Sequence, residues 1–186
     1  MAKIVVMLAD GFEEIEGLTV VDICRRCGIE TTMVSIMQDK QVVSSHNIPV
    51  IADVMFNDVD FSEVDMIVLP GGLKGTQNLE ACEPLMEKID EFYKTDKYVA
   101  AICAAPSILG HRGILNGRIA CSYPSFEGHL VGAVVTQDPV AKSDNVITGR
   151  GMGVSTEFAL KLAEQFVDRS VVEDVANGVI YTKLMK

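Results

Sequence analysis

Three short apolar runs constrain the fold of this chain more than any other feature of its sequence: residues 4–8 (IVVML), 66–69 (MIVL) and 99–102 (VAAI). Runs of this length, rich in β-branched side chains, are typical of strands buried on both faces of a parallel sheet. Parallel neighbours need a crossover between them, which is usually a helix. The chain is therefore predicted to be an α/β protein, with a mainly parallel sheet and helices on both faces.

The remaining segments carry helical and strand patterns that fit this architecture. Helices are expected over about residues 13–27, 84–95 and 154–166. Gly28 ends the first of them and Pro84 opens the second. A last helix is expected to start at a capping box formed by Ser170 and Glu173. Further strands are expected over residues 30–37, 118–121, 131–136 and 145–148, with a small hairpin over 41–51.

The composition bounds the size and the environment of the protein. Its 186 residues, 48% hydrophobic and 23% charged, predict one globular domain over residues 1–186. The net charge of −10 disfavours nucleic acids and anionic membranes as partners. The opening apolar run is short and acidic residues follow it at once, so we expect a cytoplasmic protein without a membrane span. Five cysteines, an odd number, argue against a disulfide framework.

Cys103 stands where the strand over residues 99–102 ends and a helix opened by Pro106 begins. The first amides of a helix lack carbonyl partners and carry partial positive charge, so they stabilise a nearby thiolate. On this basis we expect the pKa of the Cys103 thiol to be lowered and its sulfur to be a nucleophile. The alternative is a small buried cysteine that only closes the strand.

Glu16 shares one face of the first expected helix with apolar residues, because Val20, Ile23 and Cys27 follow it at helical spacing. A carboxyl group in apolar surroundings has a raised pKa and stays protonated more easily. It can then donate a hydrogen bond to a thiolate and act as a general acid or base. The alternative is that Glu16 lies at the helix end and meets water.

The loop Pro70-Gly71-Gly72 follows the run over residues 66–69. Its two glycines let backbone amides approach a ligand closely, and with the amide of Ala104 they would form an oxyanion site. Pro-Gly-Gly is equally compatible with an ordinary turn.

Two further sets of residues were considered as ligands or redox groups. Cys24 and Cys27 have the spacing of a dithiol or zinc pair, but they fall in the last turn of the expected helix and no second pair accompanies them. Packing in the core or against a second subunit is the favoured interpretation. The three histidines, His46, His111 and His129, show no ligand spacing. We therefore expect no metal and no cofactor.

Four segments, in order and spanning most of the chain, carry a resemblance to a known family: ADGFEEIE at 9–16, VLPGG at 68–72, AAICAAP at 100–106 and GRGMGVSTEFAL at 149–160. In these segments the chain resembles the ThiJ/PfpI superfamily, in the branch of the parkinsonism-associated deglycase (DJ-one). The resemblance implies a flavodoxin-like three-layer sandwich and a homodimer.

The resemblance also implies which residues form the site. Cys103 matches the reactive, oxidisable cysteine of the family, and Glu16 matches the carboxyl that faces this sulfur. The amides of Gly72 and Ala104 match an oxyanion-type pocket, which Gly71 adjoins.

The chain departs from its relatives at three positions around this pocket. Tyr123 stands where some members carry a histidine, and His46 stands where others carry an arginine. The peptidase-like branch has a histidine directly after the nucleophile, where this chain has Ala104. A Cys–His peptidase would therefore lack its base, whereas Tyr123 and His46 remain candidate pocket residues.

The activities implied are those of a glyoxalase, which turns methylglyoxal into lactate without glutathione, and of a hydrolase-like deglycase, which repairs early glycation adducts. The partner would then be a small aldehyde, a dicarbonyl or a glycated substrate. The alternative is a redox-responsive protein with little turnover, in which Cys103 is oxidised to a sulfinate and the protein has a stress-protective or chaperone role. A protein that only assists folding is the third class considered.

Overall fold

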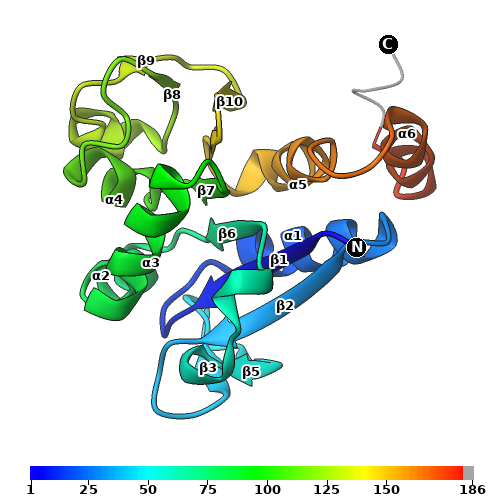
Figure 1. Ribbon diagram of the computed structural model, residues 1–186, viewed down its shortest axis with the longest axis horizontal. Coiled ribbons are helices and arrows are strands. Elements are labelled where there is room, and N and C mark those ends of the chain that lie inside the picture. The colour runs from blue at the N-terminus through cyan, green and yellow to red at the C-terminus, as the bar shows by residue number, and fades with distance from the viewer. Residues whose placement is uncertain (182–186) are drawn as a thin grey trace.

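The computed structural model describes residues 1–181, and a twisted central sheet dominates it (Figure 1). The strands of this sheet are β1 (Lys3–Leu8), β2 (Glu30–Ser35), β5 (Val54–Met55), β6 (Met66–Leu69), β7 (Tyr98–Ile102), β10 (Val140–Ser143) and β11 (Val146–Gly149). Their spatial order is β10-β11-β7-β6-β1-β2-β5. Only the β10–β11 pair in this sheet is antiparallel.

Two small two-stranded sheets flank the central one. The predicted hairpin is present, with β3 (Gln41–Val43) antiparallel to β4 (Pro49–Ile51). The other pair, β8 (Ile119–Ala120) and β9 (Val134–Val135), is parallel and shorter than the strands expected there.

Six α-helices of the described residues pack around the central sheet. They are α1 (Glu14–Arg26), α2 (Leu73–Glu80), α3 (Glu83–Lys94), α4 (Pro106–His111), α5 (Ser155–Ala163) and α6 (Arg169–Gly178). One buried cluster joins one face of the sheet to α1, α5 and α6, and a second joins the other face to α2, α3 and α4. Figure 1 shows these two groups of helices on opposite sides of the sheet. Within residues 1–181, none of the helices is long and apolar enough to cross a membrane.

The strand order confirms the predicted fold class. Read from β2, the parallel strands run β2-β1-β6-β7-β11, which is the doubly wound order 2-1-3-4-5 of flavodoxin-like proteins. The order in which strands are added to the sheet reverses between β1 and β6, although these two strands are parallel. Ligands in such folds bind outside the carboxyl ends of the strands that flank this point.

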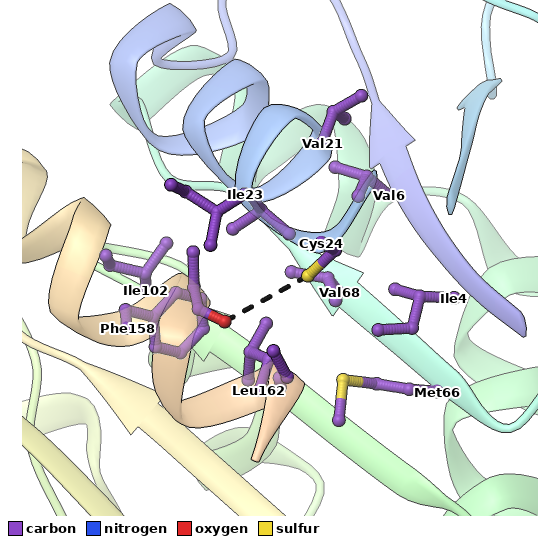
Figure 2. Packing of buried hydrophobic residues seen from close by; sticks show 14 of the residues in the cluster. Ile4, Val6, Val21, Ile23, Cys24, Met66, Val68, Ile102, Phe158 and Leu162 are labelled. Carbon is purple, nitrogen blue, oxygen red and sulfur yellow. Dashed lines mark hydrogen bonds between the residues drawn. The ribbon is translucent and has the colours of Figure 1, made fainter. Parts of the chain in front are cut away.

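Cys24 lies in the core between α1 and α5, among the side chains that Figure 2 shows, and its sulfur faces the carbonyl oxygen of Ala159 at 4.0 Å. It is fully buried, and Cys27 is 4% exposed. Burial raises the pKa of Cys24 far above the ordinary range of a thiol. Of the two packing interpretations of this pair, in the core or against a second subunit, core packing is confirmed for Cys24.

The predicted start of the last helix was wrong. The helix begins at Arg169, with Asp168 rather than Ser170 at the N-cap position, and no side chain caps it. Glu173 instead pairs with Arg169 one turn away, at 2.7 Å.

Three elements were not foreseen, namely α2, β5 and β10. The helix α2 contains Gly75, whose residue type weakens helical patterns. Glycine is needed there because a Cβ atom would stand 2.7 Å from the backbone of Phe12. Tertiary packing thus stabilises a helix that the local helix propensity does not predict.

Candidate active site

Cys103 occupies the turn that follows β7, as predicted, and its backbone is strained there. Its φ angle is +64°, in a region that residues other than glycine rarely adopt. Two hydrogen bonds hold this conformation: the Cys103 amide donates to the carbonyl of Gly149, and its carbonyl accepts from the amide of Tyr123, both at 2.9 Å. The side chain is nearly buried, since the residue is only 7% exposed.

Glu16 faces this sulfur from the first turn of α1. The residue is fully buried, and its carboxyl forms a hydrogen bond with the Cys103 thiol. Its Oε2 accepts from the amide of Gly71 at 2.8 Å. Its Oε1 is buried and has no hydrogen-bond partner among the residues that the structure describes. The carboxyl therefore has little besides the sulfur with which to exchange a proton, and the alternative of a solvated helix end is excluded.

Two backbone amides complete the surroundings of the sulfur. The N–H groups of Gly72 and Ala104 both donate toward the Cys103 side chain, from the loop after β6 and from the turn after β7. Gly72 has a φ angle of +86° and is the N-cap of α2. The amide pair was expected to hold an oxyanion, and the structure places it around the sulfur itself.

Burial raises the pKa of Glu16 from 4.5 to about 7. The hydrogen bonds from the Gly71 amide and from the Cys103 thiol act in the opposite direction, and the charge of Glu13 adds to the rise. The raised pKa that the helical spacing predicted is thus confirmed.

The expected lowering of the Cys103 pKa was wrong. Burial, followed by the charge of Glu16 and its hydrogen bond to the thiol, raises the pKa of Cys103 to about 12. The amides of Gly72 and Ala104 lower the pKa, but the three effects that raise it are larger. Helix-end amides alone therefore do not make this sulfur a thiolate at neutral pH.

Cys103 and Glu16 consequently titrate as one unit. Between the two pKa values the pair keeps a single proton and a single negative charge. An ionised Glu16 can take the thiol proton while the sulfur attacks an electrophile, and it can return that proton later. The geometry therefore provides a nucleophile with its own general base.

The remaining candidate pocket residues lie at different distances from this pair. Gly71 is wedged between its two members, whereas Tyr123 touches it only through its backbone. Tyr123 is 43% exposed and stands at the N-cap position of the short 3-10 helix Pro124–His129. His46 lies in the turn of the β3–β4 hairpin, where its Nδ1 is 2.7 Å from Glu14 Oε1.

Two residues near the site were not identified from the sequence. Glu13 is 4% exposed, and its charge acts on Glu16. Ser45, in the hairpin turn, donates from its hydroxyl to Glu13 Oε2 at 3.0 Å. The sequence signal for this region is the pair Glu13-Glu14 at a helix start. This signal is ambiguous, because the helix dipole also stabilises acidic residues at that position.

Comparisons with known proteins identify the family of this chain. Residues 2–165 match the model of the DJ-1/PfpI family. Protein dj-1beta of Drosophila melanogaster is 34% identical over 177 residues, covering 94% of this chain and 95% of that protein. The glutathione-independent glyoxalase DJR-1.2 of Caenorhabditis elegans is 30% identical over 164 residues, covering 88% and 87%.

A solved structure of Toxoplasma gondii DJ-1 in an oxidized form superposes with a TM-score of 0.92 at 29% identity, covering 97% of this chain and 98% of that one. Together these matches confirm the resemblance drawn from the four sequence segments.

Replacing Gly71 with alanine is expected to force the pair apart. A Cβ atom at this position would stand 2.6 Å from Cys103 Cβ and 2.6 Å from Glu16 Oε2. We expect Gly71→Ala to lower the free energy of unfolding by about 1–3 kcal/mol, measured by urea denaturation. Gly128→Ala is the matched control, because a Cβ there meets nothing within 4 Å. Equal stability of the two variants would contradict the close packing.

The raised pKa of Glu16 predicts a pH-dependent stability. Between pH 4.5 and about 7 the folded protein keeps a proton on Glu16 that the unfolded chain releases, so stability falls as the pH rises through this window. The shift corresponds to about 3 kcal/mol.

The measurement compares urea denaturation of wild type and Glu16→Gln at pH 4.5 and pH 7.5, with EDTA present to keep the thiol free of trace metal. The difference in unfolding free energy between the two proteins is expected to change by that amount. An unchanged difference would show that Glu16 titrates as it does in an unfolded chain.

Proposed function

Because this chain belongs to the DJ-1/PfpI family, we propose that it is a cysteine-dependent glyoxalase that converts methylglyoxal and related small dicarbonyls into hydroxy acids. The observation that carries the proposal is the buried Cys103–Glu16 pair with the amides of Gly72 and Ala104 aimed at its sulfur. The glyoxalase among the relatives, which works without glutathione, supports the same reaction class.

In the first step, Cys103 Sγ adds to the aldehyde carbon of the substrate. The thiol proton passes to Glu16 as the C–S bond forms, and the aldehyde oxygen takes up negative charge. The amides of Gly72 and Ala104 lie beside the sulfur, so they are placed to stabilise this oxygen. Return of the proton from Glu16 gives a neutral hemithioacetal.

In the second step, Glu16 removes the hydrogen from the former aldehyde carbon and delivers a proton to the neighbouring ketone carbon by way of an enediol. The first carbon is oxidised to a thioester and the second is reduced to an alcohol, so the electrons balance within the substrate. Water then cleaves the thioester, which releases lactate and restores the thiol. A pKa of about 7 suits Glu16 to both directions of proton transfer near neutral pH.

The same site is proposed to act on early adducts between dicarbonyls and amines. Such adducts keep the carbon skeleton of the dicarbonyl, and addition of the sulfur in place of the amine would release the repaired amine. We further propose that the protein acts as a cytoplasmic homodimer. Exposed apolar side chains on α1 and the hairpin, Ile15, Ile48 and Ile51, support an association surface.

A second candidate function is oxidation of Cys103 as a redox response. The two amides point at the sulfur itself and are therefore placed to hold the oxygens of a sulfinate. A protonated Glu16 would donate a third hydrogen bond. The oxidized Toxoplasma gondii relative supports this candidate.

Lactate formation from methylglyoxal tests the enzymatic proposal. We expect Cys103→Ser to lower turnover to below roughly one-thousandth of wild type, because the nucleophile is lost. Glu16→Gln should lower it roughly a hundredfold or more, because an amide cannot carry the proton. Cys82→Ser, at a half-buried cysteine that caps α3, is the control and should keep wild-type turnover. Equal turnover in all four proteins would end the proposal.

Intact-mass measurement after mild peroxide treatment tests the redox candidate. Two equivalents of hydrogen peroxide convert the thiol to a sulfinic acid and release two waters, so wild type should gain two oxygens, and peptide mapping should place them on Cys103. In Glu16→Ala the side-chain donor is lost, whereas Glu16→Gln keeps an N–H donor, so the mass should advance to three oxygens in the alanine variant only. An unchanged mass at peroxide doses that oxidise free cysteine would count against a redox role.

A further inference from the structure

Glu13, Glu14 and His46 form a cluster of metal-ligating side chains beside the active site. One ligand atom from each residue lies within 4.8 Å of the others. Two come from the start of α1 and the third from the turn of the β3–β4 hairpin, so the fold brings together residues more than thirty positions apart. One imidazole nitrogen with two carboxylates is a donor set for divalent first-row transition metals.

Glu13 gives independent evidence that the cluster has a ligand. The residue is 4% exposed, and its Oε1 is buried without a hydrogen-bond donor among residues 1–181. A buried carboxylate oxygen with no donor is unfavourable, because it loses water and gains nothing in return. A cation bound between Glu13 and its neighbours would supply the missing partner.

Ser45 lies at the centre of the cluster. Its Oγ is 3.0 Å from Glu13 Oε2, 3.1 Å from Glu14 Oε2 and 3.1 Å from His46 Nδ1. Its amide donates to the carbonyl of Phe12 at 2.8 Å, which holds the hairpin turn against the start of α1. The hydroxyl carries one proton and donates to one of the two carboxylates at a time, so the second carboxylate oxygen beside it lacks that donor. The hydroxyl oxygen is also a further ligand in reach of a cation there.

The cluster and the Cys103–Glu16 pair use different sides of the α1 start. Glu16 directs its carboxyl to the sulfur and to the amide of Gly71, whereas Glu13 directs its own to Ser45. The cluster therefore makes no hydrogen bond to the thiol–carboxyl pair, on which Glu13 acts only through its charge.

We propose that Glu13, Glu14 and His46 form a binding site for a divalent first-row transition metal of the Zn²⁺ class. One ligand atom from each residue lies within 4.8 Å of the others, and His46 Nδ1 is 2.7 Å from Glu14 Oε1. Ligands at about 2.0–2.2 Å from a tetrahedral zinc are about 3.3–3.6 Å from one another, so side-chain rotations that open the His46–Glu14 contact and draw in Glu13 would give this geometry. The imidazole favours such a metal over Mg²⁺ or Ca²⁺, which prefer oxygen ligands alone. Bound metal would clamp the β3–β4 hairpin to α1. No metal was expected from the spacing of the histidines and cysteines, and this site departs from that expectation.

A zinc titration tests the site, with the competing thiol removed. Zn²⁺ is added to the Cys103→Ser protein in competition with a chromogenic zinc indicator, and one equivalent per chain is expected to bind. In the same background, His46→Ala and Glu14→Gln should each weaken the affinity at least about tenfold. Zinc should also raise the Tm of Cys103→Ser but not of the doubly substituted protein that carries His46→Ala.

His111→Ala in the same background is the matched control. His111 is also a histidine paired with a glutamate, since its Nδ1 lies 2.6 Å from Glu80 Oε1 and its Nε2 lies 3.1 Å from His129 Nδ1. Among residues 1–181 it belongs to no group of three ligand atoms like the cluster above. Zinc affinity should be unchanged in this protein. An affinity that His46→Ala leaves unchanged, or that His111→Ala lowers equally, would overturn the site. His46 is exposed and belongs to neither buried cluster, so His46→Ala is expected to leave the fold intact, which the Tm of the zinc-free protein checks.

Discussion

The contact between the Glu16 carboxyl and the Cys103 sulfur depends on the absence of a side chain at Gly71. This glycine stands between the two groups, and its amide holds one carboxylate oxygen in place. Its loop follows β6, Cys103 follows β7, and Glu16 follows β1 through the start of α1. All three strands are parallel neighbours, so their carboxyl ends bring the three residues to one edge of the sheet, next to the point where the strand order reverses.

Burial at this edge decides the chemistry of the pair. It raises the pKa values of both acids, and the first to ionise makes ionisation of the second harder. At neutral pH the pair therefore holds one proton, which moves from the sulfur to the carboxylate as the sulfur reacts. The sulfur is not a permanent thiolate. This arrangement serves both candidate functions equally well. What separates them is the electrophile, a carbonyl carbon in the glyoxalase reaction and a peroxide oxygen in the redox response.

Patterns within one element were readable from the sequence, and contacts between elements were not. The apolar run over residues 66–69 has the bounds of β6, and the helical spacing after Glu16 located a buried carboxyl. The thiol pKa was misjudged because a helix start is visible in the sequence, whereas the depth of the sulfur and the charge beside it are not. The helix α2 and the Glu13–Glu14–His46 cluster were missed for the same reason, since Gly75 and His46 acquire their roles only from distant neighbours.

The start of α1 links the hairpin to the active site through one connected set of backbone hydrogen bonds. The amide of Gly11 donates to Val43 and the carbonyl of Phe12 accepts from Ser45, which bind this turn to the hairpin. The amide of Glu13 donates to the carbonyl of Gly71 at 2.9 Å, which binds it to the glycine loop. Glu16 lies one helical turn further on, so its distance from the sulfur is set by both attachments. A ligand that tightens the hairpin against α1 would therefore fix the position of the general base without touching the nucleophile.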